Sequence, residues 1–221
     1  MTVWLRDPVD LGVDAFLEAQ GEALRRPELR QVAAWAVEAA RSLIRPAVAY
    51  DWFPVAIDGH QVRVGGVLLH LGRHQELLER AQEALVGVAT IGPLLEQEAR
   101  RLGQEGRTLD AFILGEVGVF AVGLLAERLH EVAERKAAER GWGVSAELAP
   151  GQLAGWDIGE QKPLCDLLDL APIGVKVTPA GLLVPEKSLS LLVGIGPGYE
   201  AREVGSPCRY CKQASTCRWR H

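Results

Sequence analysis

The residues with the clearest chemistry are the cysteines near the C-terminus. Cys208, Cys211 and Cys217 stand within the last fourteen residues of this 221-residue chain. The two residues between Cys208 and Cys211 allow a tight turn to bring both sulfurs to one side, where they can bind the same metal ion. Cys217 can supply a third thiolate, and the fourth ligand can be Cys165, His221 or an external group. The sequence therefore predicts a metal centre, with free or disulfide-forming thiols as the alternative.

The number of protein ligands distinguishes two kinds of metal centre. Three cysteines with one open position suit a [4Fe–4S] cluster, whereas four protein ligands that include His221 suit a structural zinc ion. The chain has four cysteines and three of them are crowded together, which is unlike the disulfide framework of a small secreted protein. We therefore expect a reducing compartment and a metal-binding tail over residues 206–221.

Length and composition indicate an ordinary globular chain. Hydrophobic residues make up 48% and charged residues 24%, and the length fits one large domain, which we assign to residues 1–205. The net charge of −5 argues against a general nucleic-acid-binding protein. The first residues lack the pattern of a signal peptide, and Glu116 interrupts the longest apolar stretch, 111–126. We therefore expect a cytoplasmic protein that binds neither nucleic acid nor a membrane.

The hydrophobic pattern predicts a mixture of helices and strands. An amphipathic helix is expected over 29–44, and a long helix over 108–140, which Gly141 ends. The stretch 84–91 is apolar on both faces and should be a central strand. Further strands are expected at 48–57, 62–64, 67–71 and 189–195, with a hairpin turn at Asp58-Gly59, and further helices at 76–82 and 94–102. The predicted fold class is α+β: a curved, mostly antiparallel sheet flanked by helices, with one long helix and a Cys-rich C-terminal tail.

The predicted long helix contains several unusual residues. Gly115, Gly118 and Gly123 each cost about 1 kcal/mol in a helix interior relative to alanine, which indicates close approach of another segment or of a flat ligand. Glu116 is either a solvent-facing residue or a site acid, and we favour the solvent-facing position. We expect His130 to be an ordinary, partly buried histidine.

The stretch 149–190 contains an uncommon order of signals. A turn at Pro150-Gly151-Gln152 is followed by a short amphipathic helix with its leucines on one face, Leu164, Leu167, Leu168 and Leu170. Asp157 stands where an N-cap would satisfy the first free N–H groups of that helix. An apolar segment over 173–177 then predicts a strand, and Val184-Pro185-Glu186-Lys187-Ser188 follows.

This stretch resembles the activation domain of vitamin B12-dependent methionine synthase, in particular the short stand-alone members of that family. Those members carry S-P-G-Y-G-x-W-x-x-x-E-Q, then L-L-D, I-G-V-x-L-T and M-V-P-x-K-S. The counterparts here are Pro150-Gly151, Trp156, Glu160-Gln161, Leu167-Leu168-Asp169, Ile173-Gly174-Val175, Thr178 and Val184-Pro185-Glu186-Lys187-Ser188. Two further matches are the A-E-x-x-H-E pattern over 126–131 and the cysteines of the tail.

The resemblance implies a ligand site. The cofactor-binding residues that it implies are Pro150, Gly151, Gln152, Trp156, Pro185, Glu186, Lys187 and Ser188. The family binds S-adenosylmethionine through an Arg before the turn, the Tyr of the turn and an acid on the long helix. The matching positions here are Ala146-Glu147, Gln152 and Gly123. Because Glu147 would repel the ligand carboxylate that an arginine attracts, we expect a degraded S-adenosylmethionine site.

Three functions follow from these features. In the first, the protein reactivates a corrinoid protein or a cobalamin-dependent methyltransferase, and cobalamin is present only through that partner. In the second, it transfers electrons through the Cys tail, and the family's link to low-potential corrinoid chemistry favours iron–sulfur over zinc. In the third, it is a non-catalytic interaction domain stabilised by zinc. Our prediction lies between the first and the second, with a working S-adenosylmethionine-binding reactivation domain as a further alternative, and it assigns no catalytic residues.

Overall fold

The computed structural model describes residues 1–6, 8–21, 26–59, 61–211, 213 and 215–216. These residues form a seven-stranded antiparallel sheet with the order β4-β3-β2-β5-β9-β6, and β1 pairs with β2 beside this path. The strands are β1 (Val3–Leu5), β2 (Ala47–Asp58), β3 (Gln61–Val64), β4 (Val67–Leu69), β5 (Glu83–Thr90), β6 (Gly143–Val144) and β9 (Ser188–Gly196). A separate hairpin contains β7 (Lys176–Val177) and β8 (Leu183–Val184). The predicted α+β class is confirmed.

The centre of the sheet follows from the sequence pattern. The doubly apolar strand β5 pairs along its whole length with β2 on one side and β9 on the other, as predicted. The turn at Asp58-Gly59 joins β2 to β3, and Gly59 has φ +56°, a conformation that glycine adopts without a Cβ penalty. The apolar pattern of β5 and the hairpin turn between β2 and β3 therefore account for the positions of these three strands in the sheet.

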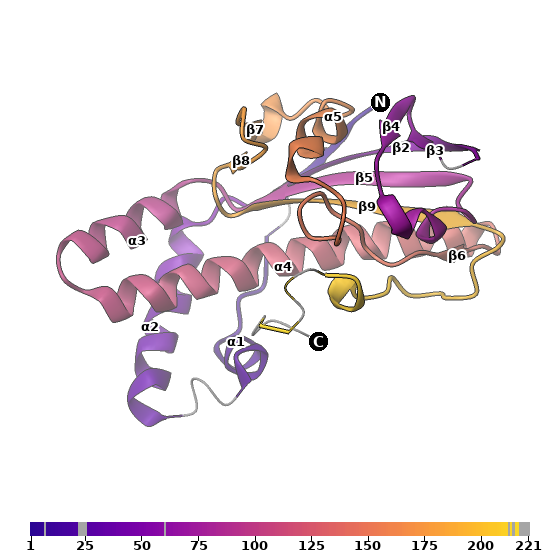
Figure 1. Cartoon of the computed structure of the whole chain (residues 1–221). Helices are drawn as coiled ribbons and strands as arrows, with labels where there is room; N and C mark the ends of the chain where they lie inside the picture. The colour runs from indigo at the N-terminus through magenta and orange to yellow at the C-terminus, as the bar shows by residue number, and fades with distance from the viewer. Residues whose placement is uncertain (7, 22–25, 60, 212, 214, 217–221) are drawn as a thin grey trace.

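Four helices pack together, and the longest of them covers one face of the sheet. They are α1 (Val13–Ala19), α2 (Pro27–Leu43), α3 (Leu94–Gln104) and α4 (Thr108–Glu139). The long helix α4 runs beneath the sheet and extends past it to pack with α2 and α3 (Figure 1). It ends where predicted, because Gly141 has φ +69° and the Trp142 N–H donates to the Ala137 carbonyl at 2.8 Å.

The length and composition of α4 would also allow it to cross a membrane. Half of its most apolar window is buried inside the protein, however, and residues such as Leu114, Val117 and Leu129 are fully buried in the core. A buried core helix can be as long and as apolar as a membrane-spanning helix, so the packing of α4 accounts for its apolar character.

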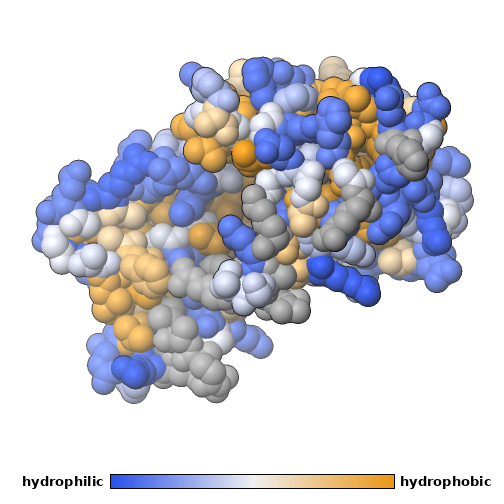
Figure 2. Space-filling view, in the orientation of Figure 1, coloured by the Kyte–Doolittle hydropathy of each residue, from blue (hydrophilic) through white to orange (hydrophobic). Residues whose placement is uncertain are grey.

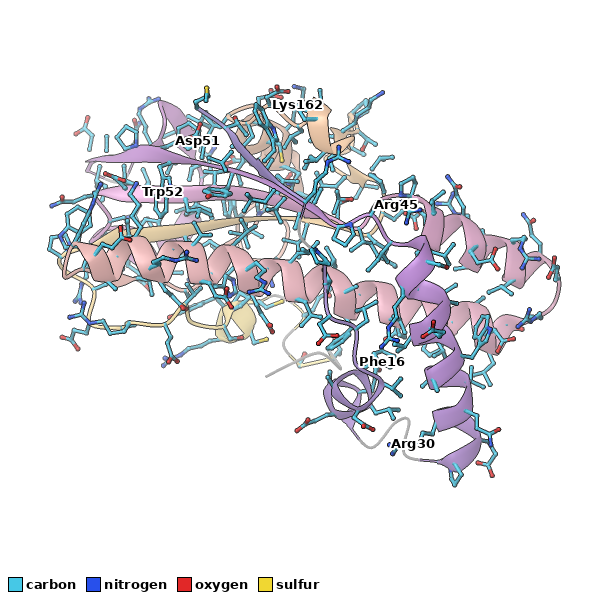
Figure 3. The ribbon with its side chains drawn as sticks, turned by 180° about the vertical axis from the view of Figure 1, so that it is seen from behind. Phe16, Arg30, Arg45, Asp51, Trp52 and Lys162 are labelled. Carbon is cyan, nitrogen blue, oxygen red and sulfur yellow. The ribbon has the colours of Figure 1, made fainter. Side chains whose placement is uncertain are left out.

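Both faces of the sheet are buried. Alternate side chains of β5 enter two different clusters, Leu85 on the face covered by α4 and Val86 on the opposite face. The neighbouring strand β2 divides its aromatic residues in the same way. Trp52 (Figure 3) packs on the α4 face, where the Nζ atom of Lys136 lies 3.7 Å from its ring centroid, and Phe53 packs on the other face.

Two local predictions are wrong. Residues 76–82 do not form a helix, because a 3-10 turn over Gly72–Leu77 and further i→i+3 hydrogen bonds bury Leu78 within a tighter turn. The short helix expected to carry Leu164, Leu167, Leu168 and Leu170 is only α5 (Gln161–Cys165), with 3-10 turns before and after it. The N-cap prediction is confirmed, since the Asp157 carboxylate accepts the Gly159 N–H at 2.7 Å.

Candidate functional site

A cleft of about 570 Å³ lies between residues 147–152, the β7–β8 hairpin and the start of β9. Its polar side chains are two carboxylates, two amides and three hydroxyls, from Glu147, Glu186, Gln152, Gln161, Thr178, Ser188 and Ser190. Apolar side chains cover the hairpin beside it (Figure 2), and Leu182 and Val184 there are 60% and 46% exposed. The cleft volume is in the usual range for a small-molecule site. The stretch that carries the family motifs therefore folds into a cleft.

The Pro150 turn builds one wall of this cleft. Gly151 has φ +77°, and a Cβ atom on it would lie 2.8 Å from the Cδ1 atom of Ile158. Its N–H donates to the Trp156 carbonyl at 2.9 Å, which closes the loop. Glycine is needed here both for the positive φ and for the close contact, and this explains why the turn contains Pro-Gly.

The predicted cofactor-binding residues divide into two groups. Those that line the cleft are Pro150, Gln152, Glu186 and Ser188, and those outside its lining are Gly151, Trp156, Pro185 and Lys187. Residues 185–187 form bends between β8 and β9, and their side chains point in different directions. Glu186 and Ser188 face the cleft, whereas the stem of Lys187 lies 3.4 Å from the Cβ position of Gly118 on α4.

The glycines of α4 have different surroundings. A Cβ atom on Gly118 would lie 2.9 Å from Leu95 of α3, so this glycine permits close packing of the two helices. A Cβ atom on Gly115 or Gly123 would meet nothing within 4 Å. Glu116 is 7% exposed, and the predicted solvent-facing position is therefore wrong. It lies on the buried face because Ile113, one helical turn earlier, points into the core.

Trp156 belongs to a hydrogen-bonded group beneath the cleft. Its side chain is 2% exposed, and its Nε1–H donates to the Glu160 carboxylate at 3.0 Å. Glu160 also accepts the backbone N–H of His70 at 3.0 Å and pairs with the His70 ring. The W-x-x-x-E spacing therefore places a buried donor and its acceptor four residues apart. The bonds between Glu160 and His70 then connect the loop that follows Pro150 to the segment after β4.

The electrostatic character of the cleft is set by carboxylates. Glu147 is held by His130 of α4, whose Nε2 atom lies 2.7 Å from Glu147 Oε2, and Glu186 pairs with Arg100 of α3. Among the described residues, the lining contains no lysine, arginine or histidine side chain. His130, which the sequence suggested to be ordinary, thus positions a cleft carboxylate from 17 residues away.

The tail places two of the predicted metal ligands in one turn. Pro207–Arg209 form a 3-10 turn capped by Ser206. Cys208 lies within this turn and Cys211 lies two residues after it, and both are half-buried free thiols. The Gln213 N–H donates to Cys211 Sγ at 3.4 Å. A Cys-ligated metal needs three or four protein ligands, and the described part of the tail supplies two thiols. Cys217 and His221 lie outside the described residues.

Cys165 does not complete this site. The described residues contain no group of three or more His, Cys, Asp and Glu side chains placed to hold a metal ion, so Cys165 does not join Cys208 and Cys211. Burial raises the pKa of the Cys165 thiol to about 11, although Gln161 donates a hydrogen bond to its sulfur at 3.2 Å. Cys165 is therefore a packing residue, and the suggestion that it is the fourth ligand is wrong.

The tail lies along the same segment that forms the cleft wall. Gly205 pairs with Ala146 and its carbonyl accepts the Glu147 N–H at 3.0 Å, while Cys211 pairs with Leu153 in an antiparallel bridge. The tail thus contacts the end of the 146–154 segment at Leu153, and Gly205, the residue before the tail, contacts its start. Neither contact was visible in the sequence, because these short pairings have no periodic hydrophobic pattern.

Comparisons with known proteins were made at the level of sequence and of fold. No family model matches the chain, and no curated protein matches it in sequence. Among solved structures, the MetH reactivation domain bound to AdoHcy is similar with a TM-score of 0.66 and 14% identity. The match covers 91% of this chain and 81% of that chain. The chain therefore has the fold of a methionine synthase reactivation domain, as its motifs predicted.

Proposed function

We propose that the protein reactivates, or passes electrons to, a corrinoid protein or cobalamin-dependent methyltransferase. The observation that carries this proposal is the fold, which is similar over 91% of the chain to the reactivation domain of MetH. The cleft supports it, because it is built from the stretch that carries the family motifs. Its acidic lining supports a degraded S-adenosylmethionine site, since nothing in the described lining would neutralise the amino-acid carboxylate.

The corrinoid partner would dock on the apolar side chains beside the cleft. Leu182 is 60% exposed on the hairpin, and Ile158 across the cleft is 37% exposed. Exposed apolar groups of this kind around a cleft are typical of interaction surfaces. A corrin ring presents a broad apolar face with polar edges, so this surface is chemically suited to it.

The test of docking uses the cobalamin-binding module of a methionine synthase, loaded with cob(II)alamin, as the partner. The full chain should bind it in interferometry and change its visible spectrum. Leu182→Glu should weaken binding at least about tenfold, as expected for a central apolar contact. Ile57→Glu is the matched control, since Ile57 is 40% exposed at the far end of β2. Absence of binding, or equal losses in both variants, would refute the proposed docking.

The tail over 206–221 would hold the metal centre, with Cys208, Cys211 and Cys217 as ligands. A [4Fe–4S] cluster is the favoured occupant because it would supply electrons for corrinoid reduction. Metal and acid-labile sulfide analysis on untagged protein purified without oxygen tests this. About four iron and four sulfide per chain would support the cluster. One colourless zinc per chain would instead support a structural tail, a role that its backbone pairing with residues 146 and 153 favours.

A further inference from the structure

The ionisable side chains that line the cleft are both acidic, so the cleft favours a positively charged ligand. Glu147 and Glu186 both line it, and the lining contains no basic side chain within the described part of the chain. The nearest arginine, Arg100, already pairs with Glu186 and lies 3.8 Å from Glu96. Lys187 extends away along Gly118. Three carboxylates, those of Glu96, Glu147 and Glu186, therefore face one arginine and His130 around this cleft, and the charge near a bound ligand is negative on balance.

Glu147 is fixed in place and is not a mobile surface acid. Its side chain is 13% exposed and hydrogen-bonded to His130, and its backbone N–H donates to Gly205. Apolar side chains such as Leu183 and Leu189 share the lining with it. A carboxylate in such partly apolar surroundings interacts more strongly with a ligand charge than one in bulk water.

We propose that the cleft selects an adenosyl ligand whose side chain ends in a cation and carries no carboxylate. Decarboxylated S-adenosylmethionine, which has a sulfonium and an ammonium group, represents this class. S-adenosylmethionine differs from it only by the carboxylate, which would lie among Glu147 and Glu186. The inference rests on the proposed function in one respect, that this cleft is the ligand site of the reactivation fold.

The test measures affinity of the full chain for both compounds by calorimetry at one fixed pH. The decarboxylated compound should bind at least about tenfold more tightly than S-adenosylmethionine, because the ligand carboxylate of the latter would lie close to a protein carboxylate in partly buried surroundings. Glu147→Gln keeps the size of the side chain and a polar contact for His130, and it should remove most of the discrimination. Glu131→Gln is the control, because Glu131 pairs with Arg128 on the surface and does not line the cleft.

The possible results separate this inference from the proposed function. Equal affinities, or tighter binding of S-adenosylmethionine, would overturn the selectivity while leaving the cleft an adenosyl site. If neither compound binds, the inference is overturned. The proposed function is tested separately, by the binding of the corrinoid module in interferometry. Discrimination that survives Glu147→Gln would also overturn it, since the carboxylate of Glu147 is the stated cause.

Discussion

Replacement of Trp156 by phenylalanine tests whether the Trp156–Glu160 pair is structural or contacts a ligand. The substitution removes the indole N–H that donates to Glu160 at 3.0 Å and part of a ring that is 2% exposed. We expect a folded protein of lower stability with an unchanged cleft, because Trp156 lies outside the lining.

The size of the effect can be worked from the contacts. A hydrogen bond to a charged group contributes about 1.5–3 kcal/mol, and the lower end applies because Glu160 keeps its bonds from His70. The smaller ring gives up roughly another 1 kcal/mol of apolar burial. The sum, about 2.5 kcal/mol, corresponds to a Tm decrease of about 5–10 °C for a protein of this size.

Urea and thermal unfolding followed by circular dichroism measure this loss, and calorimetry with the adenosyl compounds measures the cleft. Trp35→Phe is the matched control, because Trp35 is 37% exposed and its ring contacts Arg107 at 5.2 Å, so about 0.5 kcal/mol should be lost. An unchanged Tm together with lost ligand binding in Trp156→Phe would refute the structural role.

Three further predictions concern the tail, the cleft and pH. Cys208→Ser with Cys211→Ser should abolish bound metal while circular dichroism stays native, and unchanged metal content would exclude the tail as the site. Glu147→Arg with Gln152→Tyr should raise S-adenosylmethionine affinity at least about tenfold, and no gain in calorimetry would show that the cleft differs beyond these side chains. Burial alone would raise the pKa of Glu83, but hydrogen bonds from Lys136 of α4 and from Arg140, which follows α4, lower it on balance. Because the folded-state pKa is the lower one, these contacts stabilise the protein above the usual carboxyl pKa of about 4.5, and the contribution is lost as pH falls through the folded-state value. The stability difference between wild type and Glu83→Gln in urea unfolding should therefore shrink as the pH falls below about 4.5, and a constant difference would contradict this.

The sequence predicted those elements whose signals are local and long. Helix α4 has a sustained apolar pattern and a glycine that ends it, and β5 is apolar on both faces, so both were found within a few residues. The segment after Gly72 was misjudged because its polar residues fit a helical period, whereas burial of Leu78 favours a tighter turn. Tertiary packing decides such short segments.

The candidate site was predicted only in part, for a physical reason. Family motifs located the cleft, but they did not separate Glu186 and Ser188, which line it, from Lys187, whose stem lies against α4. That division depends on how the bends over residues 185–187 turn the chain against α4, which the motif does not specify. The pairing of His130 with Glu147 joins a helix to a loop, and no spacing rule within one element gives such a contact.

The tail and the cleft form one structural unit, although the sequence presents them as separate features. The 146–154 segment forms a wall of the cleft with Glu147, and it pairs with Cys211 of the tail and with Gly205 just before the tail. Two short backbone pairings without an extended ladder are weak on their own. A metal bound near Cys208 and Cys211 would hold the tail in place, and the wall with it. The double cysteine variant should therefore be assayed for cleft affinity as well as for metal, because a change in both would follow from this shared segment.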